Sequence, residues 1–468
     1  MLNPGQFERR LRGVSTAAVV GLVAILAALS YWQVYRSDLG EDDQNPRLLS
    51  AFVDPMRGRI LDREGNVLAR SEADGSRVYS DASVAHVLGY IDPRYGSQGA
   101  ELAFNDVLTG EGTSGWRGAF EAEFGGRTAR GEDLQLTIDP RLQAAAARAL
   151  GSRKGAVVAL DPRNGDILAM VSVPTYDPGA LGEDGEALLR DEDSPLLNRA
   201  TQGLYPPGST FKVVTAASAF ESGVITPATR VNCPGEIVVE GFPISCRNTP
   251  QGVGTYPFRD AFTFSVNAIF GDVGARLLGW NRLEATAARF GFGTRLDFTT
   301  DTARSQLHSS RADRTQVLLA TTAFGQGELL ATPLQMAVVA AIVANGGVLV
   351  QPHVGLNVVD RAGGKRSAET TTSRRVLTPE VARTLNDLMV GVIEAGQASG
   401  VAISGVRVAG KTGTAETGRA GVSHAWFIGF AGAGDAQVAV AVIVEDGGQG
   451  GSVAAPIAGQ VLRAALAR

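Results

Sequence analysis

A serine and a lysine stand three positions apart in the stretch Y-P-P-G-S-T-F-K, which spans residues 205–212. If a helix begins near Ser209, the Ser209 hydroxyl and the Lys212 amine lie on one face, a turn apart. A serine hydroxyl becomes a strong nucleophile when a neighbouring base takes its proton. A lysine serves as that base once burial or nearby positive charge lowers its pKa. The alternative is a capping serine followed by a surface lysine, because S-x-x-K alone occurs by chance in many proteins.

Two further motifs strengthen the catalytic interpretation. Residues 265–267 read S-V-N and begin 53 positions after Lys212, and residues 411–414 read K-T-G-T and begin 144 positions after Asn267. The motifs S-x-x-K, S-x-N and K-T-G in this order are typical of penicillin-binding proteins and serine β-lactamases. Chance production of all three, in order, is very improbable.

The chain resembles the class B penicillin-binding proteins over nearly all of its length, and the closest subtype is the short actinobacterial-style elongation or division enzymes. The segments that carry the resemblance are R-G-R-I-L-D-R-E-G-N-V-L-A at 57–69, G-E-D-L-Q-L-T-I-D at 131–139, L-Q at 142–143, N-R-A at 198–200, G-Q-G at 325–327, A-T-P-L-Q at 331–335 and A-W-F at 425–427. Val266 occupies a variable position of the family's S-x-N motif. The segment 36–150 is too short for the glycosyltransferase domain of class A relatives.

The resemblance implies a serine D,D-transpeptidase, which acts on the D-Ala-D-Ala end of a peptidoglycan stem peptide and is acylated by β-lactams. In this scheme Ser209 attacks the carbonyl of the penultimate D-alanine, with neutral Lys212 as the base. Ser265 relays a proton to the departing D-alanine. Lys411 supplies positive potential, which also helps to keep Lys212 neutral.

The resemblance also implies the groups that bind the substrate. The backbone N–H groups of Ser209 and Thr414 form the oxyanion hole. The hydroxyls of Thr412 and Thr414 bind the terminal carboxylate, and Asn267 hydrogen-bonds the donor peptide. Gly413 lets the substrate lie along the strand edge as an added strand, because it has no side chain. An amine of a neighbouring stem then attacks the acyl-enzyme.

Three other functions remain open at this stage. A D,D-carboxypeptidase or a β-lactamase would deliver the same acyl group to water, although we find no convincing dedicated deacylating base. A penicillin-sensing receptor would carry a signalling domain, whereas the segment before the apolar N-terminal run is too short for one. A non-catalytic cell-wall scaffold would be expected to lose Ser209, Lys212 or Lys411, and all three are present.

The composition argues against nucleic acid and metal as partners. The net charge of −5 gives no reason to expect nucleic-acid binding. The four histidines are scattered, and the chain has neither H-E-x-x-H nor a paired C-x-x-C motif. We therefore expect no metal site and no cofactor.

The N-terminal residues predict a membrane anchor. Three arginines at positions 9, 10 and 12 precede an uncharged run that extends over positions 13–35, and acidic residues follow it. A run of this length can span a bilayer as a helix, and the charge asymmetry places the N-terminus in the cytoplasm and the rest outside. A cleaved signal peptide is the alternative, but its apolar core is shorter. An anchored transpeptidase without a glycosyltransferase domain implies a membrane partner, a glycan polymerase of the shape, elongation, division and sporulation (SEDS) family.

The elements that must position the motifs divide the chain into three predicted segments. These are the cytoplasmic tip and anchor (1–35), a membrane-proximal pedestal module of the dimerisation type (36–150) and the transpeptidase domain (151–468). The pedestal is expected to include two short strands around the Glu-Gly-Asn turn at 64–66.

The transpeptidase domain shows clear strand and helix signals. Runs at 155–161 and 166–173 predict a hairpin buried on both faces, and strands are expected at 425–430 and 437–445. Helices are expected to begin after Thr332, after Thr378 and near Ala455. Hairpins at both ends of the domain with helices between them indicate an α+β fold, an antiparallel sheet covered by helices. The resemblance implies the penicillin-binding/serine β-lactamase-like form of this fold, a five-stranded sheet flanked by helices with a helical subdomain.

The two cysteines are candidates for a local bridge. Cys233 and Cys246 lie close together in the sequence, and a Pro-Gly turn follows the first. An extracytoplasmic location permits disulfides, so we favour a bridge over two unrelated buried thiols.

Overall fold

The computed structural model describes residues 20–22, 25, 31, 57–110, 131–247, 251–432 and 437–467. The chain forms two compact units, 1–54 and 55–468, and the second contains all three motifs. The predicted anchor at 13–35 lies almost wholly outside the described residues. Within the described ranges, no helix combines the length and the apolar character needed to cross a membrane.

The centre of the larger unit is an antiparallel five-stranded sheet in the order β17-β18-β19-β7-β8. Its strands are β7 (Gly155–Leu160), β8 (Ile167–Val173), β17 (Val408–Glu416), β18 (Ser423–Ala431) and β19 (Val438–Val444). The predicted hairpin and both predicted C-terminal strands are confirmed. Nearly every residue of β7, β8 and β19 is buried, as their continuous apolar runs require.

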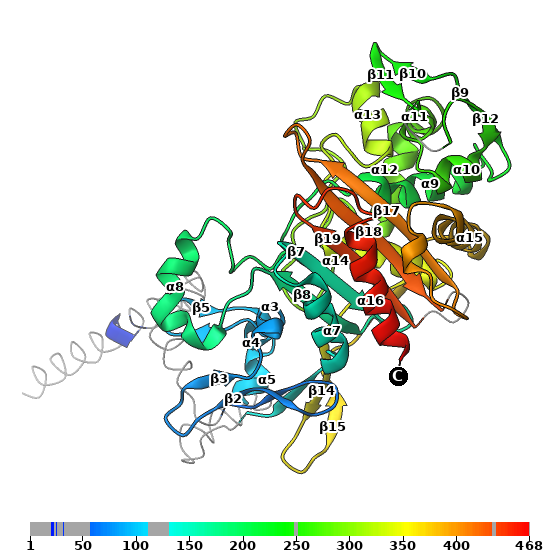
Figure 1. Ribbon diagram of the computed structural model, residues 1–468. Coiled ribbons are helices and arrows are strands. Elements are labelled where there is room, and N and C mark those ends of the chain that lie inside the picture. Colours follow the sequence, from blue (N-terminus) through cyan, green and yellow to red (C-terminus); the bar gives the residue numbers. More distant parts are fainter. Residues whose placement is uncertain are drawn as a thin grey trace, which may run out of the picture. The chain divides into compact units, whose positions relative to one another are not determined.

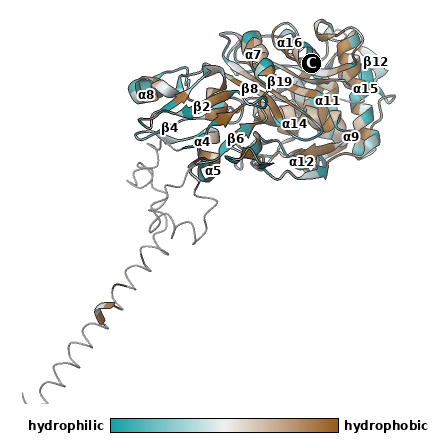
Figure 2. Ribbon diagram, turned by 90° about the horizontal axis from the view of Figure 1, so that it is seen from below, coloured by the Kyte–Doolittle hydropathy of each residue, from teal (hydrophilic) through white to brown (hydrophobic). Residues whose placement is uncertain are grey.

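Helices cover both faces of this sheet (Figure 1). Helix α14 (Pro333–Ala344) packs against β7, β18 and β19, and α16 (Ala454–Leu466) packs against β18, β19 and α7 (Pro140–Leu150). Helix α15 (Pro379–Ala395) lies beside β17. Figure 2 shows the hydrophobic character concentrated in the sheet and in α14, whose residues 333–343 are all buried.

Two of the three predicted helix starts rest on side-chain caps. The Thr332 side chain accepts a hydrogen bond from the Gln335 N–H, and the Thr378 side chain accepts one from the Val381 N–H. Each cap satisfies a backbone donor that the first turn leaves without a helical partner. The starts at Pro333, Pro379 and Ala454 confirm the three predictions.

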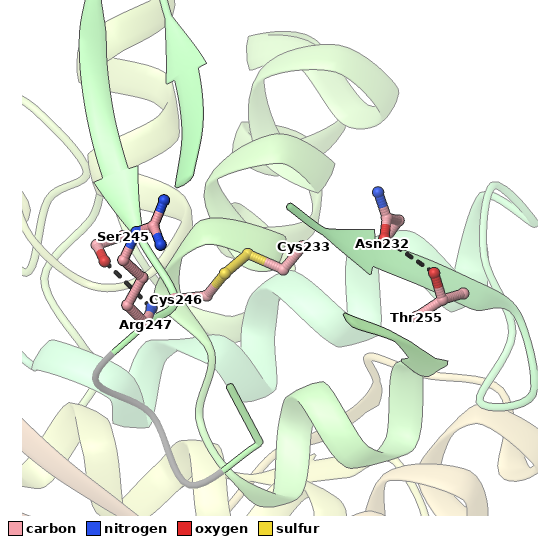
Figure 3. The surroundings of a disulfide bond; sticks show 6 residues. All are labelled: Asn232, Cys233, Ser245, Cys246, Arg247 and Thr255. Atoms are coloured by element: carbon pink, nitrogen blue, oxygen red, sulfur yellow. Dashed lines mark hydrogen bonds between the residues drawn. A yellow bond between two sulfur atoms is a disulfide. The ribbon is translucent and has the colours of Figure 1, made fainter. Parts of the chain in front are cut away.

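A helical subdomain adjoins β17. Its helices are α9 (Lys212–Glu221), α10 (Phe258–Thr263), α11 (Asn267–Asp272), the π-helical turn η7 (Val273–Leu278), α12 (Gly279–Phe290) and α13 (Gln316–Ala323). Four short strands extend from it, β9 (Arg230–Cys233), β10 (Glu236–Val239), β11 (Phe242–Ser245) and β12 (Gly254–Pro257). A disulfide joins Cys233 at the end of β9 to Cys246 just after β11 (Figure 3).

The N-terminal part of this unit is built on a six-stranded sheet in the order β15-β14-β6-β1-β2-β3. Its strands are β1 (Ile60–Leu61), β2 (Val67–Ser71), β3 (Arg77–Tyr79), β6 (Asp133–Leu136), β14 (Gly355–Val359) and β15 (Lys365–Ser367). The two strands expected around the Glu-Gly-Asn turn are confirmed as β1 and β2. Strands β14 and β15 come from the later part of the chain, so the sheet draws on residues beyond the predicted pedestal 36–150. The boundaries at 35 and 150 stay predictions.

Short elements complete the fold. They are η3 (Ala82–Val84), α3 (Ala85–Leu88), β4 (Ile91–Asp92), β5 (Gly96–Ser97), α4 (Gly99–Ala103), α5 (Asn105–Thr109), η5 (Pro178–Ala180), α8 (Leu181–Arg190), η6 (Gly208–Phe211), β13 (Val348–Val350), β16 (Ser373–Arg375) and η8 (Ser399–Val401). The buried carboxylate of Glu101 pairs with Arg57 at 2.9 Å and with Arg77 at 2.7 Å. Removing one partner of such a buried pair would leave an uncompensated charge, so these contacts tie α4 to Arg57 before β1 and to Arg77 of β3.

Candidate active site

Ser209 lies in a tight turn at the start of the helical subdomain. The turn is the 3-10 segment η6 (Gly208–Phe211), and the α-helix α9 begins only at Lys212. A helix therefore does begin near Ser209, as expected, but its first turn is 3-10 and α-helical geometry starts only at Lys212. The 3-10 geometry still places positions 209 and 212 on one face, because residues three apart eclipse one another in it. Ser209 is half-buried, whereas Thr210 and Phe211 are fully buried.

Two glycines allow this turn to form. Gly208 has a φ of +55°, and its N–H donates to the Gly325 carbonyl over 2.9 Å. Gly325 has a φ of +93°, and a Cβ there would collide with the Gly208 carbonyl. A left-handed conformation in such close contact admits only glycine. The G-Q-G segment noted in the sequence is thus a backbone support for the nucleophile turn.

The residues before the turn are anchored to the central sheet. The Tyr205 hydroxyl donates to Glu445 over 2.7 Å, and the Trp426 indole N–H donates to the Pro206 carbonyl over 2.9 Å. Arg199 also donates to the Glu445 carboxylate over 2.7 Å. These contacts give the N-R-A and A-W-F segments a positioning role, which the motif search did not assign.

The Lys212 amine lies at the centre of a buried hydrogen-bond network. Its Nζ lies 2.8 Å from the Ser265 carbonyl oxygen, 3.0 Å from the Ser265 hydroxyl oxygen and 2.6 Å from Asn267 Oδ1, all within hydrogen-bond distance. As a neutral amine it donates to the carbonyl and to Asn267 Oδ1, and its lone pair accepts from the hydroxyl. Burial of the amine, and then the charge of Lys411, hold the pKa of Lys212 well below its usual range. A lowered pKa is the property that the base requires.

Lys411 enters the same network from β17. Its Nζ donates to the Ser265 hydroxyl over 2.9 Å and to the Thr412 carbonyl over 3.2 Å. Burial lowers the pKa of Lys411 to about 7. The Ser265 hydroxyl therefore lies within hydrogen-bond distance of both amines. Near neutral pH the charged and neutral forms of Lys411 are both populated.

Ser265 adopts a backbone conformation that is uncommon for a residue with a side chain. Its φ is +60°, in the left-handed region. The hydrogen bonds from the Ser265 N–H to Phe262 O, at 3.1 Å, and from the Val266 N–H to Ala261 O, at 2.9 Å, hold the loop in place. Strain of this kind persists only where the surroundings fix it, and it concentrates at functional sites.

Two aromatic rings flank the amines. Lys212 Nζ lies 5.2 Å from the centre of the Phe270 ring, and Lys411 Nζ lies 6.0 Å from the centre of the Phe262 ring. Both rings are completely buried. They exclude water from the amines, which explains the desolvation behind the lowered pKa values. Motif reasoning missed both residues, because a core phenylalanine carries no local signal.

The remaining candidates lie on β17, an edge strand of the central sheet. Thr412 is nearly buried, and Thr414 is exposed. A Cβ on Gly413 would lie 2.9 Å from the Pro207 carbonyl and 3.0 Å from the Thr210 methyl. A glycine at position 413 therefore has a structural role besides the predicted one, because it lets β17 pack closely against the turn that carries Ser209.

The structure brings Lys212, Ser265, Asn267 and Lys411 into one network, but it does not pair Lys212 with Ser209. Across the described ranges of the chain, no group hydrogen-bonds the Ser209 hydroxyl. Catalytic hydrogen bonds often form only in the substrate complex. The arrangement offers a nucleophile, a neutral amine one turn away and a hydroxyl relay to a second amine, which together suit acyl transfer. The individual roles stay predictions.

Comparisons with known proteins agree with this chemistry. The model of the penicillin binding protein transpeptidase domain matches residues 155–463, and that of the penicillin binding protein A dimerisation domain matches residues 57–134. Peptidoglycan D,D-transpeptidase PbpA of Mycolicibacterium smegmatis is 38% identical over an alignment of 501 positions, gaps included, with 97% of this chain and 98% of the relative covered. PbpA of Mycobacterium tuberculosis is 37% identical over an alignment of 498 positions, with the same coverage.

The fold comparison leads to the same proteins. The imipenem acyl-enzyme complex of penicillin-binding protein A from M. tuberculosis superimposes with a TM-score of 0.81 at 35% identity. The match covers 89% of this chain and 100% of the other.

Proposed function

This chain belongs to the penicillin-binding protein transpeptidase family, and we propose that it cross-links peptidoglycan stem peptides as a D,D-transpeptidase through an acyl-enzyme on Ser209. The observation that carries the proposal is the Ser265 hydroxyl, which lies 3.0 Å from the Lys212 amine and 2.9 Å from the Lys411 amine. A hydroxyl between two desolvated amines provides a route for a proton from the nucleophile to the leaving group.

In acylation, the Ser209 oxygen attacks the carbonyl carbon of the penultimate D-alanine, and its proton passes to neutral Lys212. The N–H groups of Ser209 and Thr414 stabilise the oxyanion. The C–N bond then breaks, and the proton travels through Ser265 to the nitrogen of the departing D-alanine. The hydroxyls of Thr412 and Thr414, next to Lys411, hold the carboxylate of the leaving group.

β-Lactams undergo the same acylation, but their leaving group stays attached to the acyl-enzyme. The strained amide carbonyl takes the place of the D-Ala-D-Ala carbonyl, and the ring nitrogen accepts the proton while it stays tethered to the acyl group. Acyl-enzyme complexes of the related M. tuberculosis protein support this step. Because β17 is an edge strand of the central sheet, its outer edge can receive the donor peptide.

The membrane arrangement is part of the same proposal. Residues 13–35 anchor the chain as a single span, the N-terminus is cytoplasmic and the catalytic domain is extracytoplasmic. Protease added to intact protoplasts should degrade the bulk of the chain, and protection of the C-terminal part would refute this topology. The anchor and the pedestal dock a SEDS-family glycan polymerase, and failure of the two to co-purify from mild detergent would argue against that partner.

The function is tested by product analysis. The full-length protein in detergent is mixed with a stem pentapeptide that ends in D-Ala-D-Ala and with an amine acceptor. A cross-linked product and free D-alanine, both lost in Ser209→Ala, are expected. Release of D-alanine without any cross-link would indicate a carboxypeptidase, and no turnover of either kind would indicate a scaffold.

A further inference from the structure

A pocket of about 570 Å³ adjoins the K-T-G strand on the side away from the amine network. It lies between the loop that follows α15 and the loop that follows β19. The residues that line it are Gln397, Thr414, Gln449, Gly451 and Ser452. All five are polar or small, and none is charged. The mechanism above uses only Thr414 among them.

The glycine-rich run that follows β19 is packed directly onto β17. The Gly450 N–H donates to Thr414 Oγ1 over 3.3 Å, and a Cβ on Gly450 would collide with the carbonyls of Gly413 and Trp426. A Cβ on Gly451 would collide with the Gln397 carbonyl. The backbone of this loop is therefore fixed against β17 and Gln397, while the side chains of Gln397, Gln449 and Ser452 are exposed at the pocket.

Strand geometry separates the pocket from the catalytic amines. Successive side chains of a strand point to opposite faces. Lys411 points to Ser265, and a Cβ on Gly413 would point to Thr210, so Thr414 belongs to the other face. The Thr414 hydroxyl is therefore proposed to bind the carboxylate of the leaving group, and Thr414 also lines the pocket.

The chemistry of transfer requires the acceptor to enter at this place. In deacylation the acceptor amine attacks the carbon from which the D-alanine amine departed, so by microscopic reversibility it occupies the same position. The carbon that bears the acceptor amine then lies where the D-alanine Cα lay, with its carboxyl group next to Thr412 and Thr414. Because Thr414 also lines the pocket, a side chain on that carbon can extend past Thr414 toward it.

We propose that this pocket is the acceptor subsite, and that it takes an uncharged polar side chain on a D-configured amino acid centre. The inference rests on the proposed transpeptidase function. The C–N bond forms between the neutral amine and the acyl carbon, and the C–O bond to Ser209 breaks. One amine proton returns to the Ser209 oxygen, so no further reactant is needed.

The lining explains the preference for an uncharged group. The glutamine side chains and the hydroxyls both donate and accept hydrogen bonds, so they match an amide. A carboxylate finds no cation among the lining residues to pair with it, whereas an amide finds both donors and acceptors there. D-Glutamine and D-glutamate have the same shape and differ in this charge, which makes them a matched pair of probes.

The test measures transfer against hydrolysis. Full-length protein in detergent is acylated by a stem-peptide donor, and mass spectrometry gives the ratio of transfer to hydrolysis with D-glutamine or D-glutamate at equal concentration. We expect the ratio for D-glutamine to exceed that for D-glutamate by about fivefold or more, the scale of an unpaired polar group. Gln449→Ala and Gln397→Ala should each lower the D-glutamine ratio by roughly 2- to 10-fold, the effect of one lost hydrogen bond.

Two further variants sharpen the result. Gln449→Arg adds a cation and should turn the preference toward D-glutamate. The control is Gln437→Ala, an exposed glutamine outside the pocket at the start of β19, which should leave the ratio unchanged. Equal use of the two probes, or ratios that none of the pocket variants alters, would overturn the acceptor subsite. Absence of acylation by the donor in the unaltered protein would instead refute the proposed function.

Discussion

The amine of Lys212 lies 2.6 Å from Oδ1 of Asn267, the shortest of the three hydrogen bonds that it makes. This contact gives Asn267 a role beyond the predicted one of binding the donor peptide. Its side-chain oxygen holds the base, and its amide N–H₂ group is left to donate to the substrate. The S-x-N motif is therefore coupled to S-x-x-K in the enzyme before any substrate arrives.

Asn267→Asp should make Lys212 a poorer base at neutral pH. A carboxylate at this distance favours the ammonium form and raises the pKa of Lys212. We expect the second-order rate of acylation by a chromogenic cephalosporin to fall by roughly 10- to 10²-fold at pH 7, as expected for one or two pKa units, and the acid limb of its pH profile to move to higher pH. Asn267→Ala removes the contact without adding charge, so it is the control. An acid limb at the same pH in Asn267→Asp and the unaltered protein would contradict this coupling.

Substitution by arginine should separate the two lysines. Arginine cannot deprotonate in a protein, so Lys212→Arg should abolish acylation. Lys411→Arg keeps the positive charge and should retain partial acylation, with a loss of roughly 10- to 10³-fold. Both side chains are fully buried, so equal thermal stability of the variants must be established first. Equal rates in the two variants would mean that another group activates Ser209.

The acylation rate should decline on the alkaline side of neutrality. Burial lowers the pKa of Lys411 to about 7, so rising pH removes the positive charge that the carboxylate needs. Falling pH instead protonates Lys212 and removes the base. The pH profile of the second-order rate constant gives the pKa values of the catalytic groups in the free enzyme. In Lys411→Arg the alkaline limb near pH 7 should vanish, because the guanidinium stays charged, and its persistence there would assign the limb to another group.

The disulfide should stabilise the helical subdomain without taking part in catalysis. Cys233 and Cys246 are 13 positions apart, and closing a loop of this size contributes about 3 kcal/mol in the chain-entropy model. The double variant Cys233→Ala/Cys246→Ala should lower the free energy of unfolding by about 2–4 kcal/mol in chemical denaturation. Its acylation rate at 25 °C should stay near that of the unaltered protein. A large loss of acylation with unchanged stability would mean that the bridge shapes the active site.

The sequence predicted the central sheet and the network residues well, since both have strong local signals. Continuous apolar runs mark β7 and β8, and threonine caps mark α14 and α15. The short motifs predicted Ser209, Lys212, Ser265 and Lys411 as site residues because their spacing is specific. The structure joins Lys212, Ser265 and Lys411 in one hydrogen-bond network, in which Ser265 has a left-handed backbone. The close contact of Gly208 with Gly325 supports the turn that carries Ser209.

Other features depend on long-range contacts that no local pattern reports. Strand β14 pairs with β6, which lies far earlier in the chain, and this pairing adds late residues to the N-terminal sheet. The rings of Phe262 and Phe270 help to lower the pKa values of the lysines, yet each looks like any core residue in the sequence. The 3-10 turn before α9 was also missed, because its tight geometry follows from contacts with Gly325 and β17 rather than from local propensity.

The central claim, that Ser209 is the acylated nucleophile, is tested most directly by mapping a penicillin adduct. The full-length protein is treated with penicillin, digested and examined by mass spectrometry, and Ser209→Ala is treated in parallel. The account predicts one adduct, on the peptide that contains Ser209, and none in Ser209→Ala. An adduct on Ser265, or an adduct of normal yield in Ser209→Ala, would contradict it.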